Sequence, residues 1–599
     1  MSFHRFVFLA LCVQCSSPGF TGSPDAGGVD ATTDGPILPS GDGSTDAGAC
    51  TCSADLHQVI CGGNVKTTCS DSQGCAGGTC IDACQASVQN GSTIGCEYYA
   101  VDPDAIIQGG CYAAFIANTW GSPVTIDVDR GGTALGNAAD FVRIPSGSGA
   151  NLTYGPLVNG QLPAGEVAIV FLAATASGPP VVATNVSCPA GVTPAYTNSD
   201  AALSGSTRGV AFHITTDRPV AAYDVYPYGG GISAIASGTL LLPTAAWTTN
   251  YLGIDSMSQT LDGTPRWLEI VGTQDGTTVT ILPTADIAAG NGVAAAAKGT
   301  PTSYTVGKGE VLQLALESSG SQSIAGSAIQ SDNPIGVWGG ASALEVPTLQ
   351  TSYADSGHQQ LPPVKALGHD YVFARFRDRY TPVESPPVML VGAVTGTTLT
   401  YDPSAPAGAP TTLTKGQAVL FAASAAFEVK SQDDQHPFYM SQFMEGCGVY
   451  AGGNEANDCR GDPEWVNTVP PQEYLTDYVF STDPTYPETE LVLVRPKGAD
   501  VTLDCAGSIT TGWQPVGSGA YEWNRVDLVT GDFQKVGSCD NGIHTMHGTA
   551  PFGVTVWGWG SAASGGPSST TYSQATSYAF PAGMSLQPIT TVVVTPEPN

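Results

Sequence analysis

Side chains that could carry acid–base or metal chemistry are scattered along this sequence of 599 residues. His544 and His547 stand close together as His-Thr-Met-His, but no glutamate gives them the HExxH pattern of a zinc site. Asp127 and Asp129 alternate before two glycines, and two carboxylates are too few ligands for calcium. No serine stands in a G-x-S-x-G nucleophile motif. The sequence therefore predicts no enzyme activity, no cofactor and no metal.

Aromatic side chains are the better candidates for ligand binding. Several lie beside glycines, as in Tyr-Pro-Tyr-Gly-Gly-Gly and Trp-Gly-Trp-Gly. Exposed rings next to flexible backbone suit stacking on sugars or a hot spot for a protein partner. The alternative, that these rings fill β cores, is favoured, because large aromatic side chains bury most of their area. The candidates are Tyr226, Tyr228, Trp338, Trp557 and Trp559.

Arg460, Gly461 and Asp462 spell the integrin-binding tripeptide. In a glycine-rich chain this sequence arises easily by chance, so integrin recognition is not expected from it. The loop would be exposed if Cys447 and Cys459 closed a small ring.

Fourteen cysteines are expected to form disulfides. Eight of them fall within residues 50–96, a density typical of an exported disulfide framework rather than a zinc site. Eight cysteines allow about 105 pairings, so their connectivity stays open. Local pairs are expected further along, between Cys447 and Cys459, between Cys505 and Cys539, and between Cys111 and Cys188. The full set is Cys50, Cys52, Cys61, Cys69, Cys75, Cys80, Cys84, Cys96, Cys111, Cys188, Cys447, Cys459, Cys505 and Cys539.

The N-terminus reads as an export signal followed by a spacer. His4 and Arg5 precede a short apolar run over residues 6–13, which predicts a signal peptide over 1–15. Cys15 is a lipidation candidate, because Leu-Cys-Val-Gln-Cys-Ser resembles a bacterial lipoprotein processing site. Residues 16–49 consist almost entirely of Gly, Pro, Ser, Thr, Asp and Ala, and predict a disordered linker. No later segment is apolar enough to span a membrane.

The remainder of the chain repeats four times. Each copy has a Gly-containing hairpin such as Gly-Thr-Thr-Val-Thr-Ile, and later a turn such as Asp332-Asn-Pro334 that opens a strand. In three copies a proline stands eight residues before a tyrosine. Prolines of the turn recur every 103 to 115 residues, the size of a β-sandwich domain. We expect a disulfide module over 50–96 and β units over 97–250, 251–370, 371–477 and 478–599.

Composition supports an all-β protein of tandem sandwich-like units, with a closed or propeller-like assembly as the alternative. The chain has 74 glycines and only 12% charged residues, which disfavours long helices and favours short strands with tight turns. Its net charge of −32 makes nucleic acid and anionic lipid poor partners. Neutral glycans, cations and cationic surfaces remain open.

Several of these stretches together resemble a known family. They are Gly95-Cys-Glu-Tyr-Tyr-Ala-Val-Asp102, Ala113-Ala-Phe-Ile-Ala-Asn118, Leu240-Leu-Leu-Pro243 and Ser331-Asp-Asn-Pro-Ile335. In order and spacing they resemble the IgGFc-binding protein N-terminal domain family, in particular exported bacterial members of myxobacterial type. The resemblance implies an extracellular β-rich module for binding and adhesion. It does not imply that this chain binds immunoglobulin.

These features together predict a secreted or outer-surface binding protein, with an extracellular protein or glycan as its partner. A structural scaffold of the envelope or matrix shares the same features and is the first alternative. A secreted hydrolase with an unrecognised site is the second.

Overall fold

A computed structural model describes residues 50–598 apart from 54, 176–185, 230–234, 257–258, 261–263, 318–321, 348–353, 382, 452–457 and 562–574. The predicted signal peptide, the linker 16–49 and Cys15 lie outside these residues. The chain divides into two compact units, and the fold described below belongs to the unit Gly48–Asn599. No helix in the described ranges is long and apolar enough to cross a membrane.

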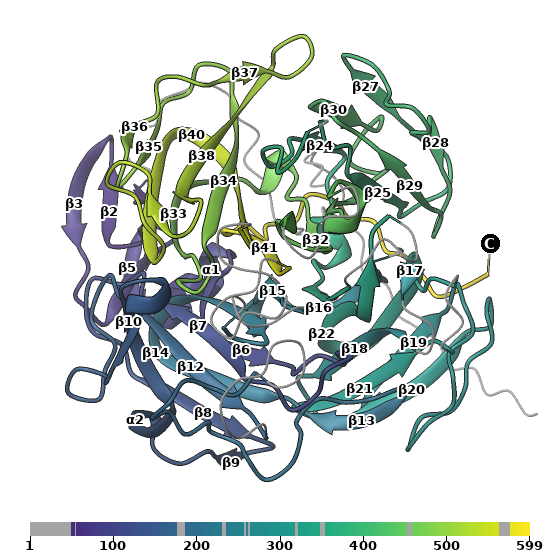
Figure 1. The fold of residues 1–599 in the computed structure, drawn as a ribbon, viewed down its shortest axis with the longest axis horizontal. Helices are drawn as coiled ribbons and strands as arrows, with labels where there is room; N and C mark the ends of the chain where they lie inside the picture. Colours follow the sequence, from purple (N-terminus) through teal and green to yellow (C-terminus); the bar gives the residue numbers. More distant parts are fainter. Residues whose placement is uncertain are drawn as a thin grey trace, which may run out of the picture. The chain divides into compact units, whose positions relative to one another are not determined.

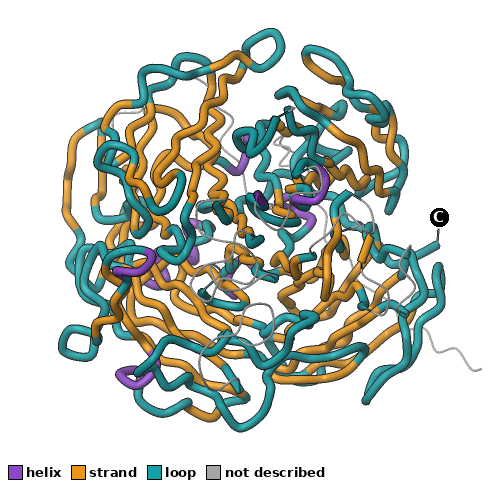
Figure 2. Tube along the Cα trace, viewed as in Figure 1, coloured by secondary structure: helices purple, strands orange, loops and turns teal. Residues whose placement is uncertain are grey.

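The described chain consists of strands and loops with a few short helical segments (Figure 2). This confirms the predicted all-β class. The cysteine-rich region forms a three-stranded and a two-stranded sheet and one helix. Its elements are β1 (Cys50–Cys52), β2 (Gln58–Cys61), β3 (Asn64–Thr68), β4 (Gln73–Ala76), β5 (Thr79–Asp82) and α1 (Ala83–Asn90).

Nine strands make up the sheet of the first repeat. They are β6 (Ile94–Ala100), β7 (Tyr112–Ala117), β8 (Ile126–Arg130), β9 (Thr133–Ala134), β10 (Val142–Ser146), β11 (Thr153–Gly155), β12 (Val167–Ala173), β14 (Phe212–Tyr226) and β15 (Ser237–Leu240). The short helix α2 (Ala138–Phe141) precedes β10.

The second repeat also has nine strands. They are β13 (Thr207–Val210), β16 (Thr248–Gly253), β17 (Gln259–Thr260), β18 (Arg266–Gly272), β19 (Thr277–Leu282), β20 (Thr302–Val306), β21 (Glu310–Ala315), β22 (Ser327–Glu345) and β23 (Asp355–Gln360). Strand β13 precedes β14 in the chain but pairs with β21, so the first repeat lends one strand to the second. The sequence did not indicate this exchange.

The third and fourth repeats complete the set. The third contains β24 (Asp370–Phe373), β25 (Pro387–Gly392), β26 (Thr397–Thr398), β27 (Thr400–Asp402), β28 (Thr412–Leu413), β29 (Ala418–Ala422), β30 (Phe427–Lys430), β31 (Phe438–Met444) and β32 (Glu464–Asn467). The fourth contains β33 (Leu475–Ser481), β34 (Glu488–Pro496), β35 (Val501–Leu503), β36 (Gly507–Ser508), β37 (Gln514–Pro515), β38 (Tyr521–Thr530), β39 (Gln534–Lys535), β40 (Ile543–Trp559) and β41 (Ser577–Pro581).

One long strand links two halves of the sheet in three of the repeats. The first part of β14 pairs with β8, and its last part pairs with β7 and β15. Strands β22 and β40 change partners along their length in the same way. In the third repeat the same path is divided into β30 and β31. Each repeat is therefore sandwich-like, as the sequence predicts.

The four repeats also close on one another. The last strand of each repeat is its innermost, and these strands contact each other in a cycle, β15 with β23, β23 with β32, β32 with β41 and β41 with β15 (Figure 1). The closed assembly offered as the alternative architecture thus coexists with the sandwich-like repeats.

The repeated turn motif acts as a clasp between two strands. Asp332 Oδ1 accepts a hydrogen bond from the amide of Thr278 at 2.8 Å, and Asp217 does the same in the first repeat. In the fourth repeat Thr549 replaces the aspartate, and its hydroxyl oxygen accepts from the amide of Asp500 at 2.9 Å. A side-chain acceptor at this position therefore joins the turn to a neighbouring strand, even where the residue type has changed.

The repeated tyrosine fixes the corner where that turn enters the next strand. In every repeat its hydroxyl donates to the carbonyl of the residue that follows the turn proline. The pairs are Tyr98 with Val220, Tyr251 with Ile335, Tyr371 with Phe438 and Tyr478 with Phe552. A buried hydroxyl needs such a partner, and the same bond recurs in all four copies.

Candidate functional site

The five aromatic candidates lie in the core and not on a surface. The exposed fraction of each is 0% or 1%, which corrects the prediction that they present rings to a ligand. The neighbouring glycines make room for other rings. A Cβ added to Gly340 would overlap Trp267, and one added to Gly558 would overlap Tyr578. The corrected residues are Tyr226, Tyr228, Trp338, Trp557 and Trp559.

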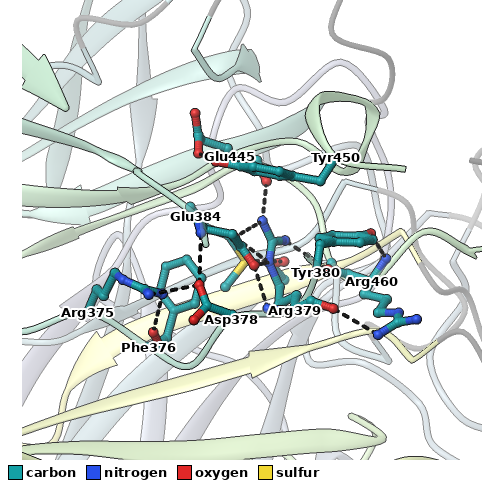
Figure 3. Close-up of polar contacts among 12 residues, drawn as sticks. Arg375, Phe376, Asp378, Arg379, Tyr380, Glu384, Glu445, Tyr450 and Arg460 are labelled. Carbon is teal, nitrogen blue, oxygen red and sulfur yellow. Dashed lines mark hydrogen bonds and ion pairs between the residues drawn. The ribbon is translucent and has the colours of Figure 1, made fainter. Parts of the chain in front are cut away.

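The integrin-like tripeptide is likewise inaccessible. Gly461 and Asp462 are buried, and only Arg460 is half-exposed. Arg460 already has partners, because its guanidinium donates to Asp458 at 2.6 Å. It also donates to the carbonyl of Arg379 at 2.8 Å (Figure 3). The Cys447–Cys459 disulfide is present, but it does not display the tripeptide.

Seven disulfides join the fourteen cysteines. The three pairs expected from the sequence are all formed, Cys111–Cys188, Cys447–Cys459 and Cys505–Cys539. In the cysteine-rich module, whose connectivity was open, the pairs are Cys50–Cys61, Cys52–Cys75, Cys69–Cys80 and Cys84–Cys96.

His544 and His547 are close in the sequence but have different partners. His544 pairs with Asp504 at 3.1 Å and is buried, whereas His547 pairs with Asp477 at 2.7 Å and is exposed. Three residues apart on β40, they point to opposite faces. Asp504, Cys505 and His544 come close enough to share a metal, but Cys505 is in a disulfide and offers no thiolate.

Two adjoining hollows form the candidate binding surface. The first, here called the α1 hollow, has a volume of about 520 Å³ and is lined among others by Gln85, Val88, Glu97, Thr244 and Lys308. The second, the β33 hollow, has about 440 Å³ and is lined among others by Asp55, Trp120, Leu475, Asp477 and Gln587. Ser92 and Ile94 line both, so the link from α1 to β6 separates them. Both volumes fall in the range of ligand pockets.

Helix α1 is held rigidly as the wall of the first hollow. Asp82 caps its N-terminus by accepting from the amide of Gln85 at 3.1 Å, and Gly91 ends it in the left-handed conformation. The Cys84–Cys96 disulfide ties the helix to β6. A short helix of eight residues is unstable alone, so these ties give the hollow a fixed shape.

Strand register places a charged group at the edge of the α1 hollow. His213 on β14 lies opposite Tyr99 on β6 and opposite Asp129 on β8. Its Nδ1 is 2.7 Å from Asp129 and its Nε2 is 2.9 Å from Glu97, while the Tyr99 ring stacks on it at 4.6 Å. Thr244 donates to the other oxygen of Glu97 at 2.8 Å.

Each charge in this group is stabilised by its neighbours. Hydrogen bonding from His213 lowers the pKa of Glu97 despite partial burial, and Lys308 lowers it further. Burial lowers the pKa of His213, but the hydrogen bonds to Glu97 and Asp129 outweigh it and raise the pKa overall. The group therefore holds an imidazolium between carboxylates and leaves Glu97 partly exposed at the rim.

The β33 hollow differs in charge. Its lining includes the carboxylates of Asp55 and Asp477 and no lysine or arginine among the described residues. Trp120 forms part of the wall and is fixed by its indole N–H, which donates to the carbonyl of Asp71 at 2.8 Å. This lining favours a neutral or cationic ligand.

No direct signal for the hollows is present in the sequence. Their lining comes from the disulfide module, the first, second and fourth repeats and the C-terminal segment, which lie hundreds of residues apart. Repeated sequence elements do reach them. The turn proline Pro334 and Pro243, the proline that precedes a tyrosine by eight residues, line the α1 hollow, and the repeated Tyr478 lines the β33 hollow.

A family model described as IgGFc binding protein matches residues 237–558, more than half of the chain. No curated protein and no solved structure matches the chain.

Proposed function

Because the chain belongs to the IgGFc-binding protein family, we propose that it is an exported adhesion protein that binds its ligand at the α1 and β33 hollows and turns nothing over. Family membership indicates an extracellular binding protein. The assignment to adhesion, to this surface and to a non-catalytic role is our inference.

The observation that carries the proposal is the pair of adjoining, rigidly walled hollows. They total nearly 1,000 Å³ of concave surface, the form expected of a recognition site. Helix α1, fixed by its caps and a disulfide, forms the wall of one of them. Rigid walls favour binding because little conformational entropy is lost when the ligand arrives.

The net charge of the chain and the acidic lining of the β33 hollow restrict the class of ligand that fits. The net charge of −32 and the acidic lining of the β33 hollow disfavour polyanions. A neutral glycan or a protein segment that carries lysine or arginine fits better. Val88 and Ile94 add apolar contact at the centre of the surface.

The electrostatics of the α1 hollow argue against hydrolysis. A glycosidase needs one carboxyl group whose pKa is raised so that it can donate a proton. The pKa of Glu97 is lowered instead, and both nitrogens of His213 are engaged by carboxylates. The group is suited to recognition rather than to proton transfer.

Localisation follows from the predicted export signal. We propose that the chain is secreted or held on the outer cell surface, with Cys15 as its lipid anchor and residues 16–49 as a spacer. Mass spectrometry of the purified N-terminus tests this point, because a lipidated Cys15 would be the first residue.

The function is tested by probing an array of neutral glycans, basic and acidic proteins and polyanions with the purified chain at physiological salt. We expect saturable binding to a neutral or cationic component. Binding confined to polyanions would contradict the electrostatic argument, and hydrolysis of any component would contradict the non-catalytic role. If no component of the array binds, a structural scaffold of the envelope or matrix becomes the favoured function.

A further inference from the structure

One imidazole ring contacts two carboxylates beside the α1 hollow. His213 Nε2 is 2.9 Å from Glu97 Oε1, and its Nδ1 is 2.7 Å from Asp129 Oδ2. A neutral imidazole carries one N–H, whereas the imidazolium carries two. Both contacts can therefore be hydrogen bonds only while the ring is protonated.

Other titratable groups face the ring from the strands on either side of it. The register places Glu97 and Tyr99 of β6, and Asp127 and Asp129 of β8, on the face of the sheet that His213 occupies. Burial raises the pKa of Tyr99 to about 12, so its phenol stays neutral beside the ring. Asp127 is exposed, and water solvates its charge. Two carboxylates are thus left in direct contact with His213.

The charges of this group cancel while the ring is protonated. Glu97 and Asp129 are negative, and His213 and Lys308, which lines the same hollow as Glu97, are positive. Loss of the ring proton leaves one net negative charge. Burial opposes protonation of His213, but its hydrogen bonds to the two carboxylates outweigh burial and raise its pKa from 6.5. The change in charge therefore falls above pH 6.5.

Of the two carboxylates, Glu97 is held less firmly. Asp129 Oδ1 also accepts from the amide of Gly132 at 3.0 Å, and this backbone contact keeps the carboxylate beside Nδ1. Glu97 Oε2 accepts only from the hydroxyl of Thr244, and the longer Glu97 side chain is 45% exposed, against 30% for Asp129. A neutral ring that keeps its proton on Nδ1 turns the lone pair of Nε2 toward Glu97. Deprotonation therefore preserves the bond to Asp129 and breaks the bond to Glu97.

We propose that loss of the His213 proton releases Glu97 into the α1 hollow and thereby makes the charge of the hollow depend on pH. The consequence for binding rests on the proposed function, whereas the release of Glu97 does not.

The protonation state of His213 then determines which ligand charge the hollow accepts. With the ring protonated, the group has no net charge and suits a neutral ligand such as a glycan. Once Glu97 is released, its carboxylate is available to the ammonium or guanidinium group of a protein ligand. His213 thus acts on specificity through Glu97, without touching the ligand itself.

The first test needs no ligand. The eight histidines of the full chain are labelled with carbon-13 at Cε1, and the signal lost in His213→Gln identifies His213. Its pH titration by nuclear magnetic resonance should have a midpoint above 6.5. The Tm values of Glu97→Gln and Asp129→Asn are then compared with that of the unaltered chain about one pH unit below and above this midpoint.

The two variants should behave alike below the midpoint and differently above it. Below it, each should lower Tm by roughly 1–2 °C, because each loses a charge-assisted hydrogen bond to the ring. Above it, Asp129→Asn should still lower Tm, but Glu97→Gln should not, because its amide N–H can donate to the unprotonated Nε2. Asp433→Asn is the matched control, because the carboxylate of Asp433 contacts only Nδ1 of His436, at 2.6 Å. Its effect on Tm should not follow the His213 midpoint.

The proposal fails if Glu97→Gln lowers Tm equally on both sides of the midpoint. It also fails if Asp129→Asn is the variant that loses its effect, since Asp129 would then be the released carboxylate. A midpoint below 6.5 overturns it even if a variant does not fold, because the ring would then not hold both carboxylates as an imidazolium.

The consequence for binding is tested by repeating the ligand array on both sides of the midpoint. The Kd of a bound cationic component should fall roughly two- to five-fold above the midpoint, the effect of one additional exposed charge, and His213→Gln should remove this change. A Kd that rises above the midpoint would overturn the effect on specificity. If no component binds, the proposed function fails, whereas the Tm comparison still decides whether Glu97 is released.

Discussion

The α1 hollow and the buried start of strand β23 both carry acidic side chains, yet the two regions stabilise charge in different ways. Glu97 keeps 45% of its side chain exposed, and it shares a hydrogen bond with His213. Asp355 is fully buried, and neither of its oxygens has a partner. A half-exposed charge is stable with one partner because water solvates the remainder, whereas a buried charge needs complete compensation. The charge of Glu97 is thus stabilised at the rim of the hollow, whereas burial raises the pKa of Asp355.

The largest loss of stability should come from removing the buried guanidinium of Arg379. Arg379→Met leaves Glu384 as an uncompensated buried charge, and we expect a loss of about 3–5 kcal/mol in the free energy of unfolding. Arg460→Met is the matched control, because the Arg460 side chain is 40% exposed and its pair with Asp458 is worth about 0–1 kcal/mol. Urea denaturation measures both. Equal losses in the free energy of unfolding would show that burial does not determine how much a charge pair contributes to stability here.

Removing the disulfide that anchors α1 should have the next largest effect. Replacing Cys84 and Cys96 by serine should cost about 2–4 kcal/mol and abolish ligand binding, because the wall of the α1 hollow is released. Replacing Cys505 and Cys539 by serine should also destabilise the chain but leave binding intact, since this pair does not line either hollow. Calorimetry and binding to the array ligand check the two results. Binding that survives loss of Cys84–Cys96 would contradict the role of α1.

A smaller and pH-dependent effect is expected at the charged group of the α1 hollow. The raised pKa of His213 stabilises the fold fully below its unfolded value of 6.5, and this is lost as pH rises through the folded pKa. The lowered pKa of Glu97 stabilises the fold above 4.5, and this is lost as pH falls through its folded pKa. His213→Gln should therefore cost about 1 kcal/mol between these two values and less at about pH 9. Thermal melts across pH would show it, and a loss that grew toward pH 9 would reverse the assignment.

The smallest effect should follow deletion of residues 16–49. The described residues that line the two hollows lie within 55–587, so we expect Tm and affinity to be unchanged. Limited proteolysis should cut this segment first and leave a resistant core. If residues 16–49 are protected while the repeats are cut, the predicted organisation is wrong.

The repeats and three of the disulfides could be predicted because the repeat motifs are local and each of these disulfides falls within one repeat. Asp332-Asn-Pro334 predicts a turn that opens a strand, and Cys447 and Cys459 are only twelve residues apart. The closed arrangement of the inner strands could not be read in the same way, because it depends on contacts between repeats.

The five aromatic candidates are core residues, which is the alternative that their size favours, and the reason is specific. The glycines beside Trp338 and Trp557 were interpreted as flexible backbone, but they leave space for rings on adjacent strands. A glycine next to an aromatic residue in a strand therefore indicates close packing as readily as exposure. The hollows had no signal in the sequence, since each collects single residues from distant parts of the chain.

The measurement that tests the binding surface most directly compares two valines of equal exposure. Val88, 55% exposed, lines the α1 hollow, and Val158, 54% exposed, lines neither hollow. Val88→Arg adds bulk and positive charge where we place the ligand, and Val158→Arg adds the same elsewhere. Titration of the array ligand should give a Kd at least about 10-fold higher for Val88→Arg, a loss of about 1.4 kcal/mol, and an unchanged Kd for Val158→Arg. Equal affinities for the two variants would contradict the assignment of the binding surface to the hollows.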